Sequence, residues 1–270
     1  MKYCEYLPPP ALAPFIRCVW TLNGAPDASA GADPVLPDGC VEIVLNFGDR
    51  FRRHVGNGEV ERQPRGIVAG QLTRSVTIEP EGAIDLLGVR FHPWGAAPFL
   101  GVAAWELRDT MLGLDDARLL SPTLDRIGDV TTDEDRVALA MRSLIELLPR
   151  ARNPRRAAAA ASALVMSGRS SPVREIAAEL GTTTRTVQQA FRDEVGMSPK
   201  TLMRLVRLQR AVAIARGAPG RSLSRVALDA GYYDHAHLAH DCLDIAGVTP
   251  SALFGAPSAI TEVFFARGAA

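Results

Sequence analysis

The chain has 270 residues, enough for two domains with separate cores, and its 47% hydrophobic and 22% charged residues are typical of a globular protein. The 4 cysteines show no CxxC or paired spacing, so we expect neither a disulfide framework nor a structural zinc site. The N-terminus, MKYCEYLPPP, lacks the apolar core of a signal peptide, and no apolar run is as long as a membrane span. We therefore expect a cytoplasmic protein that has no contact with a membrane.

Charge is divided unevenly along the chain. Residues 1–151 hold 15 Lys and Arg against 21 Asp and Glu, a net of −6, whereas residues 152–257 hold 14 against 8, a net of +6. Residues 258–270 carry one charge of each sign, so the total of zero hides two halves of opposite sign. A basic half beside an acidic half indicates that only the second approaches a polyanion.

The N-terminal segments predict a series of short strands. These strands are rich in β-branched and aromatic residues and are separated by turn signals such as Pro37-Asp38-Gly39. They are expected at residues 15–22, 40–47, 51–55, 66–71, 75–79 and 84–92. Residues 24–33 are small and polar, which predicts a loop. Strands at these spacings favour a small β-barrel or sandwich.

Helices are predicted after the last strand, at residues 96–100, 104–111 and 115–120. A stronger helix is expected at residues 133–148, because carboxylates favour its first turn and apolar residues form one stripe. The stripe consists of Val137, Met141, Leu144, Ile145 and Leu148. It can pack on a second copy of the chain or on the barrel of its own chain, and the sequence favours neither. The proline-containing segment 149–154 breaks the helical pattern, which places a domain boundary between residues 1–151 and 152–257, with a tail at 258–270.

The C-terminal half begins with an alanine-rich helix, predicted at residues 155–167. Residues 173–200 then predict two short helices joined by a tight turn, a helix-turn-helix. Gly181 suits the left-handed turn, and the three threonines after it can cap the second helix. That helix, residues 184–194, is the candidate recognition helix. Its outward side chains, which can hydrogen-bond bases and phosphates, are Arg185, Gln188, Gln189 and Arg192.

The same pattern returns after a long helix at residues 200–216, which is roughly 25 Å long. Residues 222–230 repeat the helix start and apolar spacing of residues 172–179, and Gly231 takes the place of Gly181. Asp234 can cap a following helix that runs to residue 246. The period is about 51 residues. Such a repeat predicts two recognition helices on one side of a duplex, whose successive major-groove faces lie about 34 Å apart.

Two helix-turn-helix units joined by a long helix resemble the AraC/XylS family of transcription regulators. The resemblance covers about residues 157–254 and depends on IAAELGTTTRTVQQAFRDEVGMSPK, RLVRLQRA and VALDAGYYDHAHLAHDCLDIAGVTPSAL. It implies a seven-helix domain that binds double-stranded DNA, with RNA polymerase as a candidate partner. By position, the residues implied to read bases are Arg185, Gln188 and Gln189, and those implied to hold phosphates are Thr183, Thr184 and Arg192. The corresponding positions of the second unit are Asp234, His235, Ala236 and His240.

The second unit departs from the family pattern. Where Arg-Glu-Phe is usual, this chain has His240-Asp241-Cys242, so a thiol replaces the aromatic core anchor and a largely neutral histidine replaces arginine. We therefore expect the second unit to bind DNA more weakly and less selectively than the first. His237, His240 and Asp241 also have the spacing of metal ligands. Three ligands on one helix rarely close a tetrahedral shell, so no metal and no cofactor are expected.

The N-terminal half also carries a resemblance. PDGCVEIVLNF, Gly-Gln near residue 70, GVRFHPWGAAPFLGV and WELRD resemble the sensor-like domain of a subgroup of AraC-type regulators, except that Trp94 stands where glycine is expected. The likeness implies an effector or dimerisation role. The candidate effector-binding residues are Trp20, Glu42, Arg90, His92 and Trp94. Alternation along the strand predicts that Arg90 or His92 faces solvent, and Trp105 could also line a cavity, although aromatic residues in a small barrel are core by default.

These observations favour an α+β protein: a ligand-responsive regulator with a β-rich effector or dimerisation domain and an all-α domain that contains two helix-turn-helix units. Its candidate partners are DNA, a small-molecule effector and a second copy of the chain. One alternative is a cysteine-based alkyl-acceptor repair enzyme fused to a DNA-binding domain. The spacing of Cys4, Cys18 and Cys40 does not resemble the zinc-thiolate cluster that such chemistry needs, and no catalytic residue is assigned. The other alternative is a constitutive regulator whose N-terminal half only dimerises.

Overall fold

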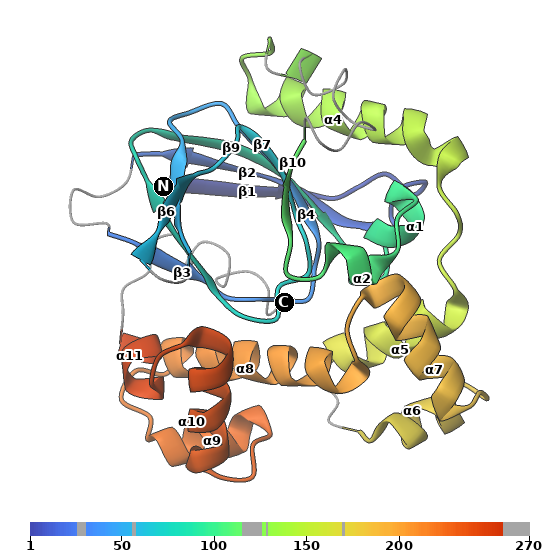
Figure 1. Cartoon of the computed structure of the whole chain (residues 1–270), viewed down its shortest axis with the longest axis vertical. Helices are drawn as coiled ribbons and strands as arrows, with labels where there is room; N and C mark the ends of the chain where they lie inside the picture. The colour runs from blue at the N-terminus through green and yellow to red at the C-terminus, as the bar shows by residue number, and fades with distance from the viewer. Residues whose placement is uncertain (26–30, 56–57, 115–125, 128, 169–170, 256–270) are drawn as a thin grey trace.

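The computed structural model describes residues 1–25, 31–55, 58–114, 126–127, 129–168 and 171–255. Its N-terminal part is β-rich and its C-terminal part is helical, so the predicted α+β class is confirmed. In Figure 1 the strands lie above a layer of helices, and helix α8 (Pro199–Gly217) runs along the boundary between the two parts. Two regions are therefore candidates for function: the exposed faces of the helices and the boundary between the two parts.

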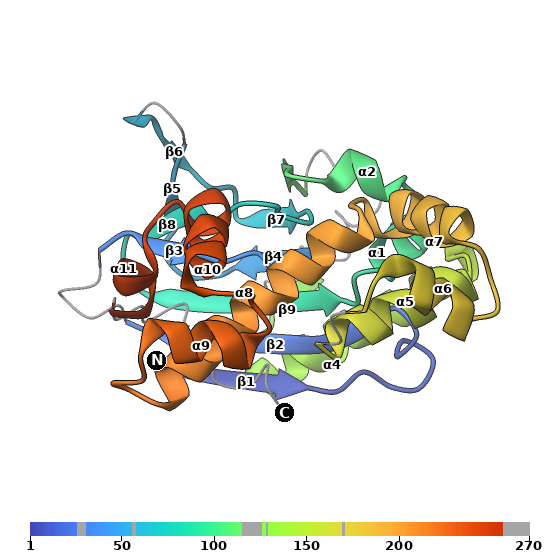
Figure 2. The ribbon, with the colours of Figure 1, turned by 90° about the horizontal axis from the view of Figure 1, so that it is seen from below.

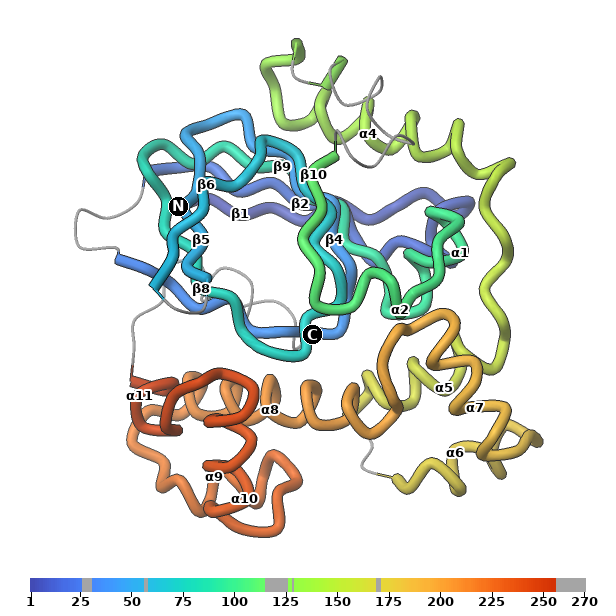
Figure 3. Tube along the Cα trace, in the orientation of Figure 1, coloured from blue at the N-terminus to red at the C-terminus, as the bar shows by residue number. Residues whose placement is uncertain are grey.

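The strands form two antiparallel sheets (Figure 3). The six-stranded sheet has the order β1-β2-β9-β4-β7-β10, and the four-stranded sheet has the order β3-β8-β5-β6. The first sheet consists of β1 (Lys2–Tyr6), β2 (Ile16–Gly24), β4 (Glu42–Asn46), β7 (Gly66–Ala69), β9 (Ile84–Phe91) and β10 (Met111–Gly113). The second consists of β3 (Asp33–Val35), β5 (Phe51–His54), β6 (Val60–Arg62) and β8 (Val76–Pro80).

Alternation along the central strands gives the six-stranded sheet two different faces. On β4, Ile43 and Leu45 belong to an apolar core, whereas Glu42, Val44 and Asn46 point to the other side and line an interior cavity. Trp20 lies against β9 on that interior side. It can do so because residue 88 is glycine, where a Cβ atom would come within 2.0 Å of the indole ring.

The predicted strands agree with the structure within a few residues, but four short ones were missed. Strands β1 and β6 fall where no element was predicted, β3 begins at the end of the predicted loop 24–33, and β10 begins at the end of the predicted helix 104–111. Edge strands of this length depend on the neighbour that supplies their hydrogen bonds: β1, for example, pairs along β2 from Lys2 with Asn23 to Tyr6 with Val19. The helix predicted at residues 104–111 ends at residue 107, because Met111 pairs with Ala69 as the start of β10. The helix predicted at residues 115–120 lies outside the described residues.

The strongest predicted helix of the N-terminal half packs on its own barrel. It is α4 (Asp133–Leu147), capped by the Thr132 hydroxyl, and Val137 and Leu144 join the core behind the six-stranded sheet. Arg136 reinforces this packing: it donates to both oxygens of Asp85 at 2.8 and 2.9 Å, and its guanidinium lies 4.1 Å from the Phe47 ring centroid. Most of the apolar stripe is therefore used within the chain. Two shorter helices, α1 (Ala96–Leu100) and α2 (Ala104–Leu107), lie beside the barrel.

The C-terminal helices share one continuous core. They are α5 (Arg156–Met166), α6 (Val173–Glu179), α7 (Thr184–Ala190), α8, α9 (Leu223–Ala230), α10 (His235–Asp241) and α11 (Pro250–Gly255). Each predicted recognition helix changes to a π-helical turn before it ends, at η3 (Phe191–Val195) and η4 (Cys242–Ala246). Figure 2 shows that α8 connects the α6–α7 pair to the α9–α10 pair. No helix among the described residues has the length and apolarity to cross a bilayer.

Candidate functional site

The first helix-turn-helix has the geometry that its sequence predicts. Gly181 takes the left-handed conformation, with φ of 61°, in the turn between α6 and α7. Thr183 Oγ1 accepts the N–H of Thr186 at 3.1 Å and so caps α7. Val187 and Phe191 are fully buried, which turns the opposite side of the helix to solvent. Arg185, Gln188, Gln189 and Arg192 are exposed there, and Thr184 is half-buried.

Two of these polar residues have intramolecular roles. Thr183 uses its hydroxyl as the helix cap, and the same oxygen lies 2.9 Å from the Thr186 hydroxyl in a second hydrogen bond. Gln189 Nε2 donates to Asp193 Oδ1 at 2.8 Å, along the axis of the recognition helix. This bond uses one N–H of the Gln189 amide and leaves its other N–H and its carbonyl oxygen for a base, while Arg185 and Gln188 are exposed on the same face.

The second helix-turn-helix repeats this arrangement with different side chains. The Asp234 carboxylate accepts the N–H of His237 at 2.7 Å and caps α10, as predicted. His235, Ala236 and His240 are exposed on its outer face. Cys242 is fully buried in the place that Phe191 has in the first unit, which agrees with the predicted exchange of an aromatic anchor for a thiol.

A buried ion pair replaces apolar packing beneath the second recognition helix. Asp241 is 1% exposed and stands where the first unit has Ala190. Arg204 of α8 donates to Asp241 Oδ1 at 2.9 Å through Nε and at 2.7 Å through Nη2, and Nη2 also donates to Asp244 at 2.6 Å. The Asp241 carboxylate is thus turned to α8, away from the exposed His240. Asp241 is therefore not available to bind a metal ion together with His237 and His240.

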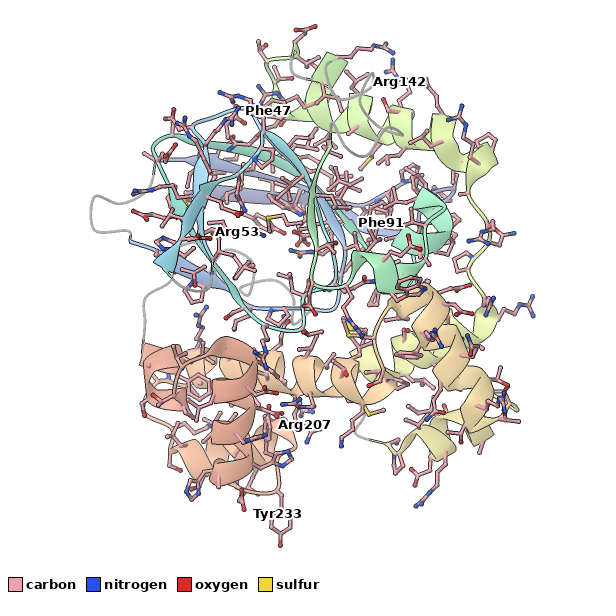
Figure 4. All side chains as sticks on the ribbon, viewed as in Figure 1. Phe47, Arg53, Phe91, Arg142, Arg207 and Tyr233 are labelled. Atoms are coloured by element: carbon pink, nitrogen blue, oxygen red, sulfur yellow. The ribbon has the colours of Figure 1, made fainter. Side chains whose placement is uncertain are left out.

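The two units lie at opposite ends of α8 and extend away from the barrel (Figure 4). Tyr233, in the turn before α10, is 86% exposed and points away from the strands in this view. Arg207, on α8, makes a cation–π contact within the second unit, with its guanidinium 5.1 Å from the ring centroid of Tyr232. The exposed polar faces of α7 and α10 are thus connected by one continuous helix, α8.

A second candidate site is a cavity of about 1120 Å³ between the barrel and the helical part. All five predicted effector-binding residues line it: Trp20, Glu42, Arg90, His92 and Trp94. The sixth candidate, Trp105, does not; it lies on α2 and is 53% exposed. Most of the remaining wall is apolar and comes from both sheets, for example Val44 and Ile78.

A charged cluster lies on one wall of the cavity. Arg90 and Glu42 face each other across β9 and β4, and Arg90 Nε donates to Glu42 Oε1 at 2.5 Å, with Asp38 3.6 Å away and Glu5 3.9 Å away. Burial raises the pKa of Glu42, an effect that the attraction of Arg90 opposes. Burial also lowers the pKa of Arg90, but Glu42 and Asp38 outweigh this effect and leave the pKa well above its ordinary value. Arg90 is therefore a permanent charge that its carboxylate neighbours already balance.

His92 and Trp94 form a stacked pair at the cavity, with ring centroids 4.6 Å apart and planes 3° apart. The indole N–H of Trp94 donates to Pro14 O at 3.2 Å, and φ of Trp94 is not positive, so the backbone at this position does not require glycine. Burial lowers the pKa of His92, and Arg17 lowers it further, so the imidazole is held neutral. The prediction that Arg90 or His92 faces solvent is wrong: the two residues are two positions apart, so alternation places them on the same face, and both side chains line the cavity.

The helical wall of the cavity was not predicted. Val206, Gln209, Arg210, Ala213 and Ile214 of α8 line it, together with Met166 at the end of α5. Gln209 Nε2 also donates to Pro37 O at 2.7 Å, which ties α8 to a loop of the barrel. In the sequence these α8 positions are indistinguishable from ordinary helix positions, because only the docking of the two parts turns them toward the strands.

The buried thiols are poor nucleophiles. Burial raises the pKa of Cys18 to about 12 and that of Cys242 to about 12, and it raises the pKa of Cys40 well above its ordinary value. A thiolate is the reactive form of cysteine, so these three side chains pack as small hydrophobes. This environment is the opposite of the one that a cysteine alkyl acceptor requires.

A β-rich domain joined to a helical domain with two helix-turn-helix units defines a DNA-binding transcription regulator. Comparison with known families gives the same result for the helical part: residues 176–256 match a family described as a helix-turn-helix domain. The C-terminal part is an AraC-type helix-turn-helix domain, as the sequence predicted. Residues 4–113 match a domain of unknown function, DUF6597.

Similar folds occur among solved structures at low sequence identity. A structure of ToxT from Vibrio cholerae O395 is 12% identical, with a TM-score of 0.48, and the match covers 92% of this chain and 98% of that one. ToxT bound to (E)-4-(8-methylnaphthalen-1-yl)but-3-enoic acid is 12% identical, with a TM-score of 0.48 and coverage of 87% and 98%. Wild-type ToxT of strain SCE256, bound to an unsaturated fatty acid, is 13% identical, with a TM-score of 0.44 and coverage of 87% and 95%. No curated protein matches the chain significantly.

Proposed function

We propose that this regulator binds DNA sequence-specifically by inserting α7 and α10 into adjacent major grooves. The observation that carries the proposal is the pair of exposed polar helix faces at the two ends of α8. That helix has 19 residues and is therefore roughly 28 Å long. This length is comparable to the spacing of about 34 Å between successive major grooves on one side of a DNA duplex.

The two helix-turn-helix units contribute differently to DNA binding. In the first, Arg185, Gln188 and Gln189 read base edges, and Thr183, Thr184 and Arg192 hold phosphates. In the second, the exposed positions are Asp234, His235, Ala236 and His240, with Leu243 where the first unit has Arg192. Because Leu243 stands where the first unit has the cationic Arg192, the second unit contributes less affinity and less selectivity.

We further propose that a small molecule in the cavity regulates DNA occupancy. The cavity has a wall from the barrel and a wall from α8, so an occupant would contact the helix that carries both recognition units. A ligand changes an equilibrium only through its different affinity for two arrangements, and a site between two domains provides such a difference. Trp20, Glu42, Arg90, His92 and Trp94 are the residues that we propose bind it.

These roles imply a division of the chain into an effector domain at residues 1–151 and a DNA-binding domain at residues 152–257. The two cores support the division, although Leu36 and Trp94 of the N-terminal part pack against the helical core. The proposed tail, residues 258–270, lies outside the described residues.

Selection of bound duplexes from a random pool tests the DNA proposal. The full chain should enrich a site with two half-sites about one helical turn apart, and Arg185→Ala should relax selectivity in one of them. Binding must be measured at a stated salt concentration, because phosphate contacts are ionic. Failure to enrich any sequence at low ionic strength would refute the proposal. Thermal-shift screening of small molecules against the wild type and Trp20→Ala tests the cavity: a ligand should stabilise only the wild type.

A further inference from the structure

The barrel contacts the two helix-turn-helix units at equivalent places, the π-helical ends of their recognition helices. In the first unit η3 lies against α1 and α2, and Gly196 follows it with φ of 77°. A Cβ atom at residue 196 would come within 2.4 Å of the Ala104 carbonyl oxygen. In the second unit, η4 meets the loop between β7 and β8. Gly247 follows η4 as Gly196 follows η3.

The loop between β7 and β8 caps the second recognition helix from another domain. The Ser75 N–H donates to Ile245 O at 2.7 Å, and the Ser75 hydroxyl donates to Ala246 O at 3.2 Å. The last carbonyls of a helix have no partner within the helix, so Ser75 supplies two donors at the position where they are needed. Arg74 adds an ion pair with Asp244 Oδ1 at 3.4 Å.

The two anchors differ in chemistry. The first is buried: Val195 is fully buried, and Gly196 packs closely against the backbone and Cβ atom of Ala104. The second is polar and open to water, with the Arg74 side chain 76% exposed. Exposed polar contacts exchange with water at small cost, so the second anchor is the one that can open without disturbing a core.

The second anchor is also continuous with the cavity. Leu72 and Val76 stand on either side of Arg74 and Ser75, and both line the cavity wall. The anchor leaves His235, Ala236 and His240 exposed, so it orients the second recognition helix without covering the face that meets DNA.

We propose that Arg74 and Ser75 are positioning residues for the second helix-turn-helix, and that the segment 72–76 transmits the state of the cavity to it. The inference rests on the proposed DNA-binding function. While the anchor is closed, the second unit is held at one angle to the barrel and the two units match one half-site spacing. When the anchor opens, the second unit is free to change its angle and must be ordered during binding. Its binding to the second half-site is then weaker, and a wider range of half-site spacings is accepted.

The test uses the full chain and a duplex with both selected half-sites. Ser75→Pro removes the N–H donor and the hydroxyl, and Arg74→Glu turns the attraction to Asp244 into repulsion. A double variant, Arg74→Ala with Ser75→Ala, serves if the proline disturbs the loop. The matched control is Arg62→Ala, which removes an exposed arginine of strand β6 that pairs with Glu81. Hydroxyl-radical footprinting and a series of half-site spacings are the measurements.

The variants should protect the second half-site roughly tenfold more weakly, the effect of one or two lost hydrogen bonds. They should tolerate spacings one base pair longer or shorter, while the first half-site, the unfolding midpoint and the control stay at wild-type values. Unchanged footprints and spacing preference in all variants would overturn the inference, as would equal loss at both half-sites. If the wild type itself binds no duplex, the proposed function fails instead, so the two failures are distinguishable.

Discussion

Replacing Arg204 by methionine should be one of the most destabilising single changes in the second helix-turn-helix. Asp241 is 1% exposed, and Arg204 donates two hydrogen bonds to it and one to Asp244. Removing one partner of a buried ion pair costs roughly 3–5 kcal/mol, because the remaining charge stays buried without compensation. The Arg204 side chain is 27% exposed, so water can reach the vacated position. We therefore expect a loss of about 3 kcal/mol in the free energy of unfolding.

The double variant Arg204→Met with Asp241→Ala should recover most of that loss. The first unit places Ala190 at the equivalent position and packs there without an ion pair, so the fold accepts the apolar solution. We expect the double variant to unfold within about 1 kcal/mol of the wild type, because replacing both partners of a buried pair is often close to neutral.

Urea denaturation of the full chain at pH 7 measures these differences, and a double-mutant cycle gives the coupling energy. Arg225→Met is the control, because Arg225 is 67% exposed and pairs with Asp229 on the same helix; it should cost no more than about 1 kcal/mol. The reasoning is refuted if Arg204→Met costs no more than the control. It is also refuted if the double variant is as unstable as the single one.

Three further predictions concern DNA, pH and thiols. Arg185→Ala should weaken binding to the selected site by about 1–3 kcal/mol, more than His240→Ala, in competition binding at fixed salt; the reverse order would show that the second unit dominates. Because the pKa of His92 is lowered in the folded state, its contribution to stability is present above the ordinary histidine pKa of about 6.5 and is lost as pH falls; His92→Gln should flatten the decline of the unfolding midpoint below that pH. Cys18 and Cys40 should not react with a thiol reagent at pH 8 until the protein is unfolded, and fast reaction in the native state would reopen the cysteine-based alternative.

The C-terminal part was the more predictable half for a physical reason. Its helices are specified by local features: apolar spacing, Gly181 and Gly231 at the turns, and the caps Thr183 and Asp234. The repeat supplies each of these signals twice. The π-helical turns were not predicted, since the buried residues Val187, Phe191 and Val195 recur every four residues, a spacing that an ordinary α-helix also allows.

The N-terminal part was predicted as a set of strands, without their arrangement. The long strands β2 and β9 were found because both have many β-branched and apolar residues. Their pairing across about 60 intervening residues follows from packing of the whole sheet, which no local pattern encodes. The same limit applies to α4: its apolar stripe was visible, but only the structure places that stripe on the barrel, where Val137 and Leu144 join the core.

The sequence by itself determined the class of the protein, the duplicated helix-turn-helix and the side chains on its exposed faces, because helical periodicity and capping are properties of neighbouring residues. Only the tertiary structure decided that Glu42, Arg90, His92 and the two tryptophans share one cavity with α8, and that the loop at Ser75 caps the second recognition helix. Those contacts join segments more than a hundred residues apart in the chain. Their formation depends on how the barrel and the helices pack as whole bodies, and no short stretch of sequence carries that information.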